Sequence, residues 1–213
     1  MTTPDRTDAF IEHLATQPDP APLRPSRVTG AALAALLCGL GVLYALLGLR
    51  PDLALAIRQP VIAAKTLVPL LLGLLALGAA FASARPAQHV TLWPLLLPLA
   101  AAFGLFVARV LATSPERMVP ELLGHTVGAC LLSITALSLV PLGLALGGLR
   151  AGASTRPART GALAGLAVGA FAVVGYSLHC PEDSPMFYVP WYGSGIALSS
   201  ALGAIAGRWL LRW

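Results

Sequence analysis

The stretch His179-Cys180-Pro181-Glu182-Asp183-Ser184-Pro185 gathers the most reactive combination of side chains in the sequence. An imidazole and a thiol stand side by side and two carboxylates follow. A thiol that faces an oxidising compartment can form a disulfide or bind a soft metal, with imidazole and carboxylates as further ligands. The competing interpretation is a tight interfacial turn, capped by Asp183 or Ser184 and anchored in an aromatic belt by Tyr188, Trp191 and Tyr192.

Two further groupings lie in one apolar run. Glu121 and His125 are spaced i, i+4, which predicts either half of a metal site or two interfacial polar residues. Cys130 follows on another face, roughly 13 Å below the outer end of a span that begins near residue 120, at about 1.5 Å per residue. A disulfide to Cys180 needs alpha carbons within about 7 Å. The two cysteines can meet this limit only if the span of Cys130 begins closer to the outer surface, if the span before Cys180 ends deeper in the membrane, or if the helices tilt. Cys38, in the middle of an apolar run, is expected to pack.

The sequence shows no pattern typical of catalysis. It contains no H-E-x-x-H, no G-x-S-x-G and no C-x-x-C, and no apolar run has an aspartate or glutamate at its middle. An enzyme working inside a membrane would need such groups. We therefore expect that the protein is not an enzyme and binds no cofactor. This expectation also excludes a membrane redox enzyme.

The composition requires a lipid environment. Of 213 residues, 57% are hydrophobic and only 11% charged, and a soluble domain of this length could not bury so much apolar surface. A membrane-spanning helix needs about 20 apolar residues. We predict an all-α membrane protein, a bundle of six transmembrane helices arranged as three hairpins. The expected spans are residues 28–49, 60–82, 90–111, 120–147, 161–178 and 190–211.

Positive charges near the span ends predict the orientation. One side carries eight arginines: Arg24, Arg27, Arg85, Arg150, Arg156, Arg159, Arg208 and Arg212. The other side has Arg50, Arg58 and Arg117, with Lys65 and Arg109 reaching the interface from within their spans. Both termini are therefore expected in the cytoplasm and the Cys180 loop outside.

Residues 1–27 are expected to form a cytoplasmic tail, and residues 28–213 the transmembrane domain. In the tail, Phe10, Ile11 and Leu14 fall on one face of a short amphipathic helix, and a proline-rich linker follows from residue 17 to 27. Such an apolar face can dock in a groove of a partner protein. The alternative is a frayed tail without a partner.

Small residues recur every fourth position in the last two spans, at Gly161, Gly165 and Gly169 and at Gly195, Ser199, Gly203 and Gly207. Such rows allow helix backbones to approach closely. Because the chain has 21 glycines, part of this spacing can arise by chance. The rows predict close packing of these two spans.

Several segments form a recognisable set: residues 130–134 (CLLSI), 137–142 (LSLVPL), the glycine rows from 161 to 169, 176–185 (YSLHCPEDSP), 191–193 (WYG) and 211–213 (LRW), with the Arg50-Pro51-Asp52-Leu53 turn and Lys65. Together these segments resemble the NrsF-like family of six-span bacterial membrane anti-sigma factors. The resemblance covers nearly all of residues 28–213.

This resemblance implies a protein of the bacterial inner (cytoplasmic) membrane whose cytoplasmic N-terminal segment holds an extracytoplasmic-function sigma factor, without direct nucleic-acid binding, catalysis or cofactor. It also implies that Cys130 and Cys180 take part in the response to a signal. The resulting hypothesis is release of the sigma factor on an envelope, redox or metal stress sensed through these cysteines, with His179 and His125 as further candidate metal ligands. The alternative, a small multi-pass transporter or channel, would need polar residues along a path at mid-membrane, and the sequence has few.

Overall fold

The computed structural model describes residues 6–16, 22–86 and 88–212, and within these ranges the chain is helical without strands. The elements are α1 (Arg6–Ala15), α2 (Pro25–Leu47), α3 (Leu53–Ala56), α4 (Pro60–Ser83), η1 (Trp93–Leu95), α5 (Leu96–Ala112), α6 (Pro115–Leu123), α7 (Val127–Leu149), η2 (Arg150–Gly152), α8 (Pro157–Ser177) and α9 (Pro185–Leu210).

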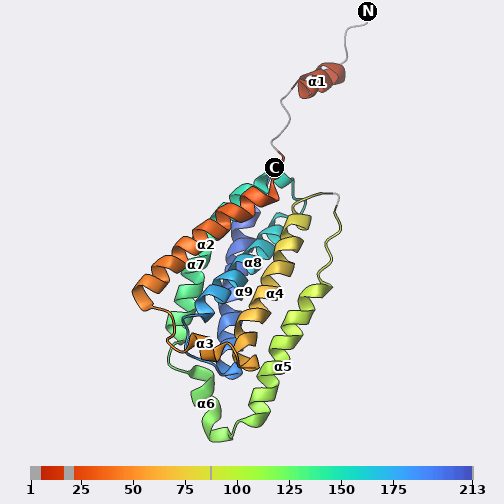
Figure 1. Ribbon diagram of the computed structural model, residues 1–213. Coiled ribbons are helices and arrows are strands. Elements are labelled where there is room, and N and C mark those ends of the chain that lie inside the picture. Colours follow the sequence, from red (N-terminus) through yellow and green to blue (C-terminus); the bar gives the residue numbers. More distant parts are fainter. Residues whose placement is uncertain (1–5, 17–21, 87, 213) are drawn as a thin grey trace, which may run out of the picture.

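The long helices run alternately down and up, so that the start of α2 and the end of α9 lie at one end of the bundle (Figure 1). We call this the tail end. The opposite end, where α3, α6 and residues 178–184 lie, is called the turn end.

Prolines mark where several helices begin. Each of α2, α4, α6, α8 and α9 has its proline in the first turn, where the missing N–H has no helical partner to lose. The spans predicted from hydropathy begin at residues 28, 161 and 190, whereas α2, α8 and α9 begin earlier, at Pro25, Pro157 and Pro185. The span expected from residue 90 begins later than predicted, since regular α-helix starts only at Leu96, after η1.

The span predicted from 120 to 147 is interrupted. Helix α6 ends at Leu123, and Gly124 takes a φ of +50° before α7 begins at Val127. A Cβ at Gly124 would lie 2.6 Å from the Phe187 ring, so only glycine fits. Cys130 therefore lies in the first turn of α7, about 4.5 Å along it at 1.5 Å per residue.

Five helical stretches are long and apolar enough to cross a membrane: α2, α4, η1 with α5, the stretch Pro115–Gly152, and α8. Helix α9 is not among them, because its glycines, serines and aromatic residues lower its hydropathy. The described chain is thus an all-helical protein with several helices of membrane-spanning length.

The centre of the bundle is the contact between α8 and α9. Gly161 and Gly165 of α8 face Gly203 and Ser199 of α9 so closely that an added Cβ would overlap the opposite carbonyl oxygen. Small residues make such backbone contact possible. The close packing predicted from the two rows of small residues is confirmed.

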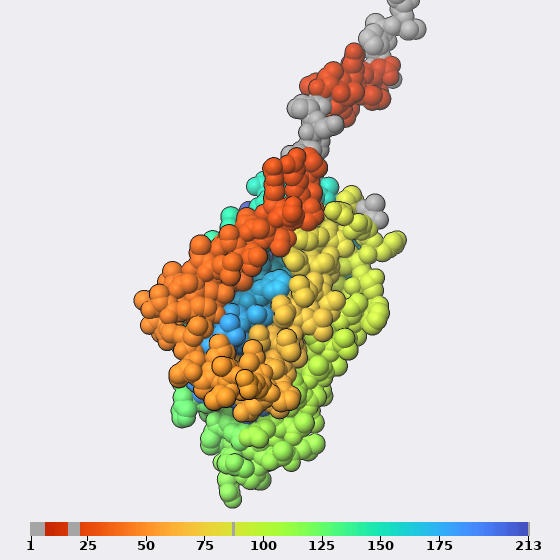
Figure 2. Space-filling view, viewed as in Figure 1, coloured from red at the N-terminus to blue at the C-terminus, as the bar shows by residue number. Residues whose placement is uncertain are grey.

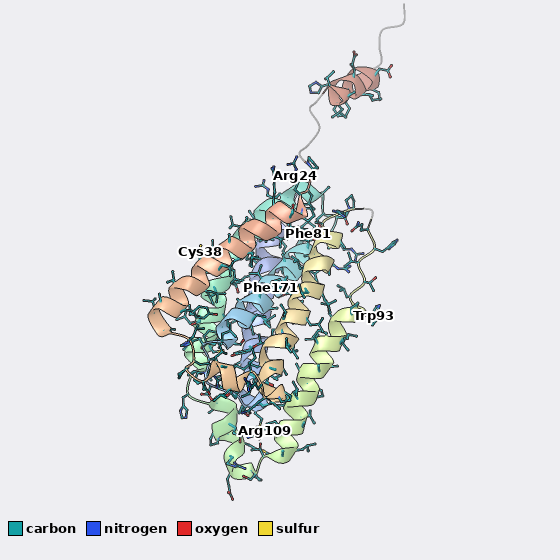
Figure 3. All side chains as sticks on the ribbon, in the orientation of Figure 1. Arg24, Cys38, Phe81, Trp93, Arg109 and Phe171 are labelled. Atoms are coloured by element: carbon teal, nitrogen blue, oxygen red, sulfur yellow. The ribbon has the colours of Figure 1, made fainter. Side chains whose placement is uncertain are left out.

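Helices α2 and α5 are peripheral. Helix α2 packs chiefly on α7, where Val28 contacts Gly148, and a hollow separates it from α4, with α8 visible at the bottom (Figure 2). Figure 3 shows Cys38 on the outward side of α2, and this thiol is exposed rather than packed as predicted. In α5, Pro98 is the buried residue.

Helix α1 lies apart from the bundle (Figure 1). Its formation agrees with the amphipathic helix predicted for the tail. The predicted proline-rich linker is only partly visible, since residues 17–21 lie outside the described residues and α2 already begins at Pro25. The division into a tail of residues 1–27 and a domain of residues 28–213 stays a prediction.

A leucine at Gly161 should destabilise the protein, because the α8–α9 backbones would have to separate. We expect the free energy of unfolding to fall by about 1–3 kcal/mol, which thermal unfolding in detergent would measure. Gly78→Leu is the matched control, since nothing lies within 4 Å of a Cβ built there. Equal Tm values for the two variants would contradict this description of the seam.

Candidate functional site

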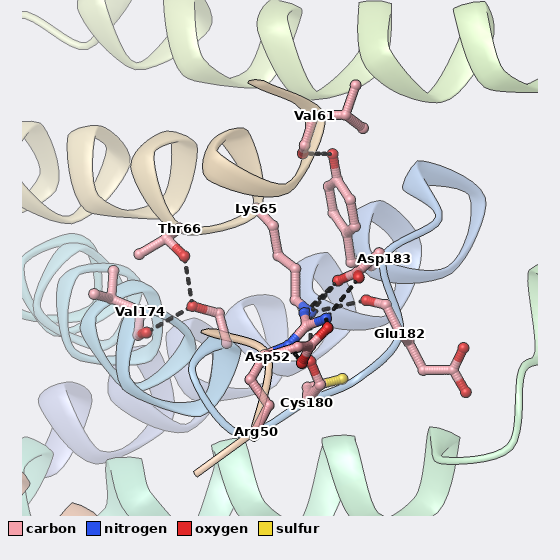
Figure 4. Close-up of polar contacts among 11 residues, drawn as sticks. Arg50, Asp52, Val61, Lys65, Thr66, Val174, Cys180, Glu182 and Asp183 are labelled. Carbon is pink, nitrogen blue, oxygen red and sulfur yellow. Dashed lines mark hydrogen bonds and ion pairs between the residues drawn. The ribbon is translucent and has the colours of Figure 1, made fainter. Parts of the chain in front are cut away.

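A buried lysine holds the turn that contains Cys180. Lys65 of α4 is 1% exposed, and its Nζ donates to the Cys180 carbonyl at 2.6 Å and the Glu182 carbonyl at 2.8 Å (Figure 4). Its third contact is Asp183 Oδ1 at 3.2 Å. The three ammonium hydrogens therefore have three acceptors. The prediction that Lys65 reaches outward to the interface is wrong, because its charge is neutralised inside the bundle.

Arg50, between α2 and α3, adds a second cation to this cluster. Its guanidinium binds Asp52 with both contacts at 2.8 Å, and Asp183 at 2.7 and 2.9 Å. Two bidentate pairs of this kind are strong and directional. Two cations and two carboxylates thus share one site, so the formal charge there balances.

The pKa shifts agree with this arrangement. Hydrogen bonds from Arg50 hold the pKa of Asp52 below its ordinary value. Burial raises the pKa of Asp183, but the Arg50 hydrogen bonds and the charge of Lys65 outweigh it, so that the pKa is lowered overall. Both carboxylates therefore stay ionised at neutral pH.

The remainder of the turn is tied to α5, α6 and the break before α7. Glu182 accepts a hydrogen bond from the His125 backbone N–H at 2.9 Å. Ser184 donates to Glu121 at 2.9 Å, and Glu121 also binds Arg109 through two 2.8 Å contacts. The proposed i, i+4 pair of Glu121 and His125 does not form on one helix, since the break at Gly124 separates the two residues.

The candidate ligand His179 is used to hold α2. Its Nδ1 lies 2.7 Å from the Gly48 carbonyl, and because a carbonyl only accepts, this nitrogen carries the proton. The ring packs against Tyr176 with centroids 5.8 Å apart. His179 therefore fixes the end of α2 to the end of α8.

The two candidate sensing cysteines lie in the same part of the core. Cys130 and Cys180 are both completely buried free thiols, and they are close enough to influence each other electrostatically. The hydroxyl of Tyr192 is buried and lies within electrostatic range of both thiols, with the Cys180 side chain as its polar neighbour. Because α7 begins only at Val127, Cys130 lies in its first turn, at the end of α7 that is near the Cys180 turn (Figure 1).

The candidate metal ligands do not form one set. Among the described residues no three His, Cys, Asp or Glu side chains gather in a way that could hold a metal ion. His125 has an exposed side chain and takes part in the turn through its backbone. The structure buries both thiols in one core cluster and leaves this imidazole outside.

The candidate partner-binding residues lie on α1. Phe10 is 60% exposed, Ile11 57% and Leu14 49%. These side chains share the exposed surface of the short helix and have no part in the bundle core. They remain available to another protein.

Sequence reasoning missed that Lys65, Arg50 and Asp183 form one cluster. The partners lie 118 and 133 residues apart, so no local spacing indicates the pairing. One signal was present: a lysine inside an apolar run needs an acidic or carbonyl partner, and acidic side chains occur at the turn end.

With this geometry in place, comparison with known proteins identifies the family. The family described as negative regulator of sigma F (NrsF) matches residues 14–213. The chain belongs to the NrsF family. A relative from Caulobacter vibrioides named anti-sigma-F factor NrsF is 36% identical over 98% of this chain and all of its own length. A probable anti-sigma-F factor NrsF from Azospira oryzae is 33% identical over 86% of this chain and 85% of its own. No solved structure matches this NrsF-family chain.

Lys65→Met should loosen the turn in this NrsF-family protein. Removing one partner of a buried ion pair costs about 3–5 kcal/mol, and two carbonyls would lose their donor. We expect a lower Tm, and faster alkylation of Cys180 by a maleimide when it is the only cysteine left. Arg58→Met, an exposed change at the same end, is the control. If both variants react at the wild-type rate, Lys65 does not hold the turn.

Proposed function

We propose that this protein is a membrane-bound anti-sigma factor that sequesters an extracytoplasmic-function sigma factor through its cytoplasmic N-terminal segment, and that it acts without catalysis or a cofactor. The observation that carries the proposal is the similarity along the whole chain to a relative named anti-sigma-F factor. The release signal in this proposal is an envelope, redox or metal stress acting on Cys130 and Cys180.

The proposal includes six membrane spans in the bacterial inner membrane, with both termini in the cytoplasm. The 26 residues of α9 extend about 39 Å at 1.5 Å per residue, which exceeds the roughly 30 Å hydrocarbon core. At the tail end the eight arginines favour the cytoplasm. At the turn end Arg50 and Lys65 are buried, which leaves mainly Arg58 and Arg117 as exposed positive charges there.

Helix α1 supplies the proposed docking element. An amphipathic helix binds a partner by laying its apolar face in a groove, and the face of Phe10, Ile11 and Leu14 is exposed for this purpose. Three anchors give modest affinity on their own. Confinement of both proteins to the membrane surface would raise the effective concentration.

Phe10→Asp should weaken binding of the sigma factor. Losing a central apolar anchor costs about 2 kcal/mol or more, which is roughly 30-fold in affinity. The measurement is co-purification of the sigma factor with the full-length protein from membranes. Ala9→Asp adds the same charge beside His13, away from the apolar face, and should bind normally. Undiminished binding by Phe10→Asp would refute docking through α1.

The two buried thiols supply the proposed sensor. A thiophilic metal ion could bridge them, or an oxidant could join them as a disulfide, in which case the thiols lose two protons and two electrons and the oxidant is reduced. Either event favours one helix arrangement only if the arrangements differ in affinity or strain. A new link at Cys180 would act on the turn that Lys65 and Arg50 hold.

Helix α4 offers a path from this turn to the tail end. Lys65 binds the turn near the start of α4, and Ser83 at its end bonds Thr160 at 2.8 Å. Thr160 in turn lies 2.6 Å from Ser154 of the loop before α8. A displacement of the turn can therefore reach the end from which the tail emerges.

Replacing Cys130 or Cys180 with serine should abolish induction of sigma-dependent genes while repression without stress persists. A serine keeps the size of the side chain but neither forms disulfides nor binds soft metals. Reporter expression with and without a thiol oxidant or cadmium measures the effect, and Cys38→Ser serves as the control. Full inducibility of both variants would remove the sensor from the proposal.

A further inference from the structure

The hollow between α2 and α4 is an apolar groove at the tail end of the bundle. It has a volume of about 270 Å³, and its walls come from α2, α4, α7 and α8. Its floor includes Ala164 and Ala167, which are nearly fully buried, while Leu33 and Leu74 at its rim are half exposed. Figure 2 shows it open to the side of the molecule, where the helices would face lipid.

Basic side chains surround the tail end of this groove. Arg27 precedes the wall residue Val28, and Arg150 follows the wall residue Leu149. Arg85 lies just beyond the end of α4, four residues after the wall residue Phe81. All three arginines are exposed. Figure 3 places Arg24 above this end of the groove, with Phe81 near it and Phe171 further along.

The segments that carry these arginines converge. A Cβ built on Gly152 would lie 2.7 Å from the Ala84 carbonyl oxygen and 3.1 Å from the Leu23 side chain. Residues 22–24, the end of α4 and η2 therefore meet at the groove mouth. An apolar slot that opens toward lipid and ends in several cations is complementary to one kind of molecule, which has a hydrocarbon chain and an anionic head.

We propose that this groove binds an acyl chain of one anionic phospholipid from the leaflet at the tail end, with its phosphate among Arg27, Arg85 and Arg150. The bound chain fills the space between α2 and α4, which otherwise have at most slight contact. Since α2 leads directly into the tail, the lipid stabilises the position of the helix that carries the tail. This site goes beyond sigma-factor binding and needs no sigma factor for its test.

The test compares phospholipids added to the purified full-length protein in detergent. Phosphatidylglycerol should raise the Tm by about 2–4 °C more than phosphatidylcholine does, and native mass spectrometry should show one phosphatidylglycerol retained per chain. Equal stabilisation by the two lipids would overturn the proposal, because an ordinary lipid contact does not select an anionic head.

Two variants separate the parts of the site. Ala32→Phe fills the groove from α2 and should abolish both the added stability and the retained lipid. The double variant Arg27→Gln/Arg150→Gln leaves the groove walls intact and should reduce the preference for phosphatidylglycerol at least threefold. The control Arg58→Gln/Arg117→Gln removes two exposed charges at the turn end and should keep the preference. Wild-type lipid selectivity in the Arg27/Arg150 variant would refute the assignment even if Ala32→Phe failed to fold.

Discussion

The structure depends on how the positive charge of Lys65 is compensated inside the bundle. An ammonium group removed from water loses several kcal/mol of hydration, and here two carbonyls and the Asp183 carboxylate replace that hydration. The carbonyls belong to the turn itself, so Lys65 is satisfied only while residues 180–183 keep their conformation. Arg50 completes the balance of charge and brings in the link between α2 and α3. Three segments distant in sequence are thereby held as one unit.

The seam between α8 and α9 imposes a different constraint. Its backbones touch through Gly161, Gly165 and Gly203, so these helices cannot slide or rotate without collision. The peripheral helices are held by side chains, which adapt more easily than backbone. Helix α2 meets α8 through Leu40 and the Tyr44 hydroxyl at Gly175 and through His179 at Gly48, and its remaining contacts are chiefly with α7. Side-chain contacts permit movement more readily than backbone contacts do. They are the contacts that hold α2, the helix that leads to the tail.

The sequence predicted the helical class, the approximate positions of the long helices and the small-residue seam, because hydropathy and four-residue spacing are local properties. It missed the break at Gly124 because the apolar run continues across it, and the need for glycine arises from Phe187, 63 residues away in the chain. It also assigned Lys65 to the interface. A lysine that snorkels and a lysine that binds a distant turn look the same until the partner is known.

The break at Gly124 connects these points. Had the predicted span formed one straight helix from residue 120, Cys130 would lie about two turns farther from that helix start than it lies from the start of α7. The break lets α7 start at Val127, and it exposes the His125 N–H to the Glu182 carboxylate. One glycine therefore sets the height of the first thiol and supplies a donor to the turn that carries the second. The position of Cys130 in the first turn of α7 follows from a backbone conformation held by Phe187 and Glu182, so a change at either buried thiol acts on residues already anchored to α4 and α6.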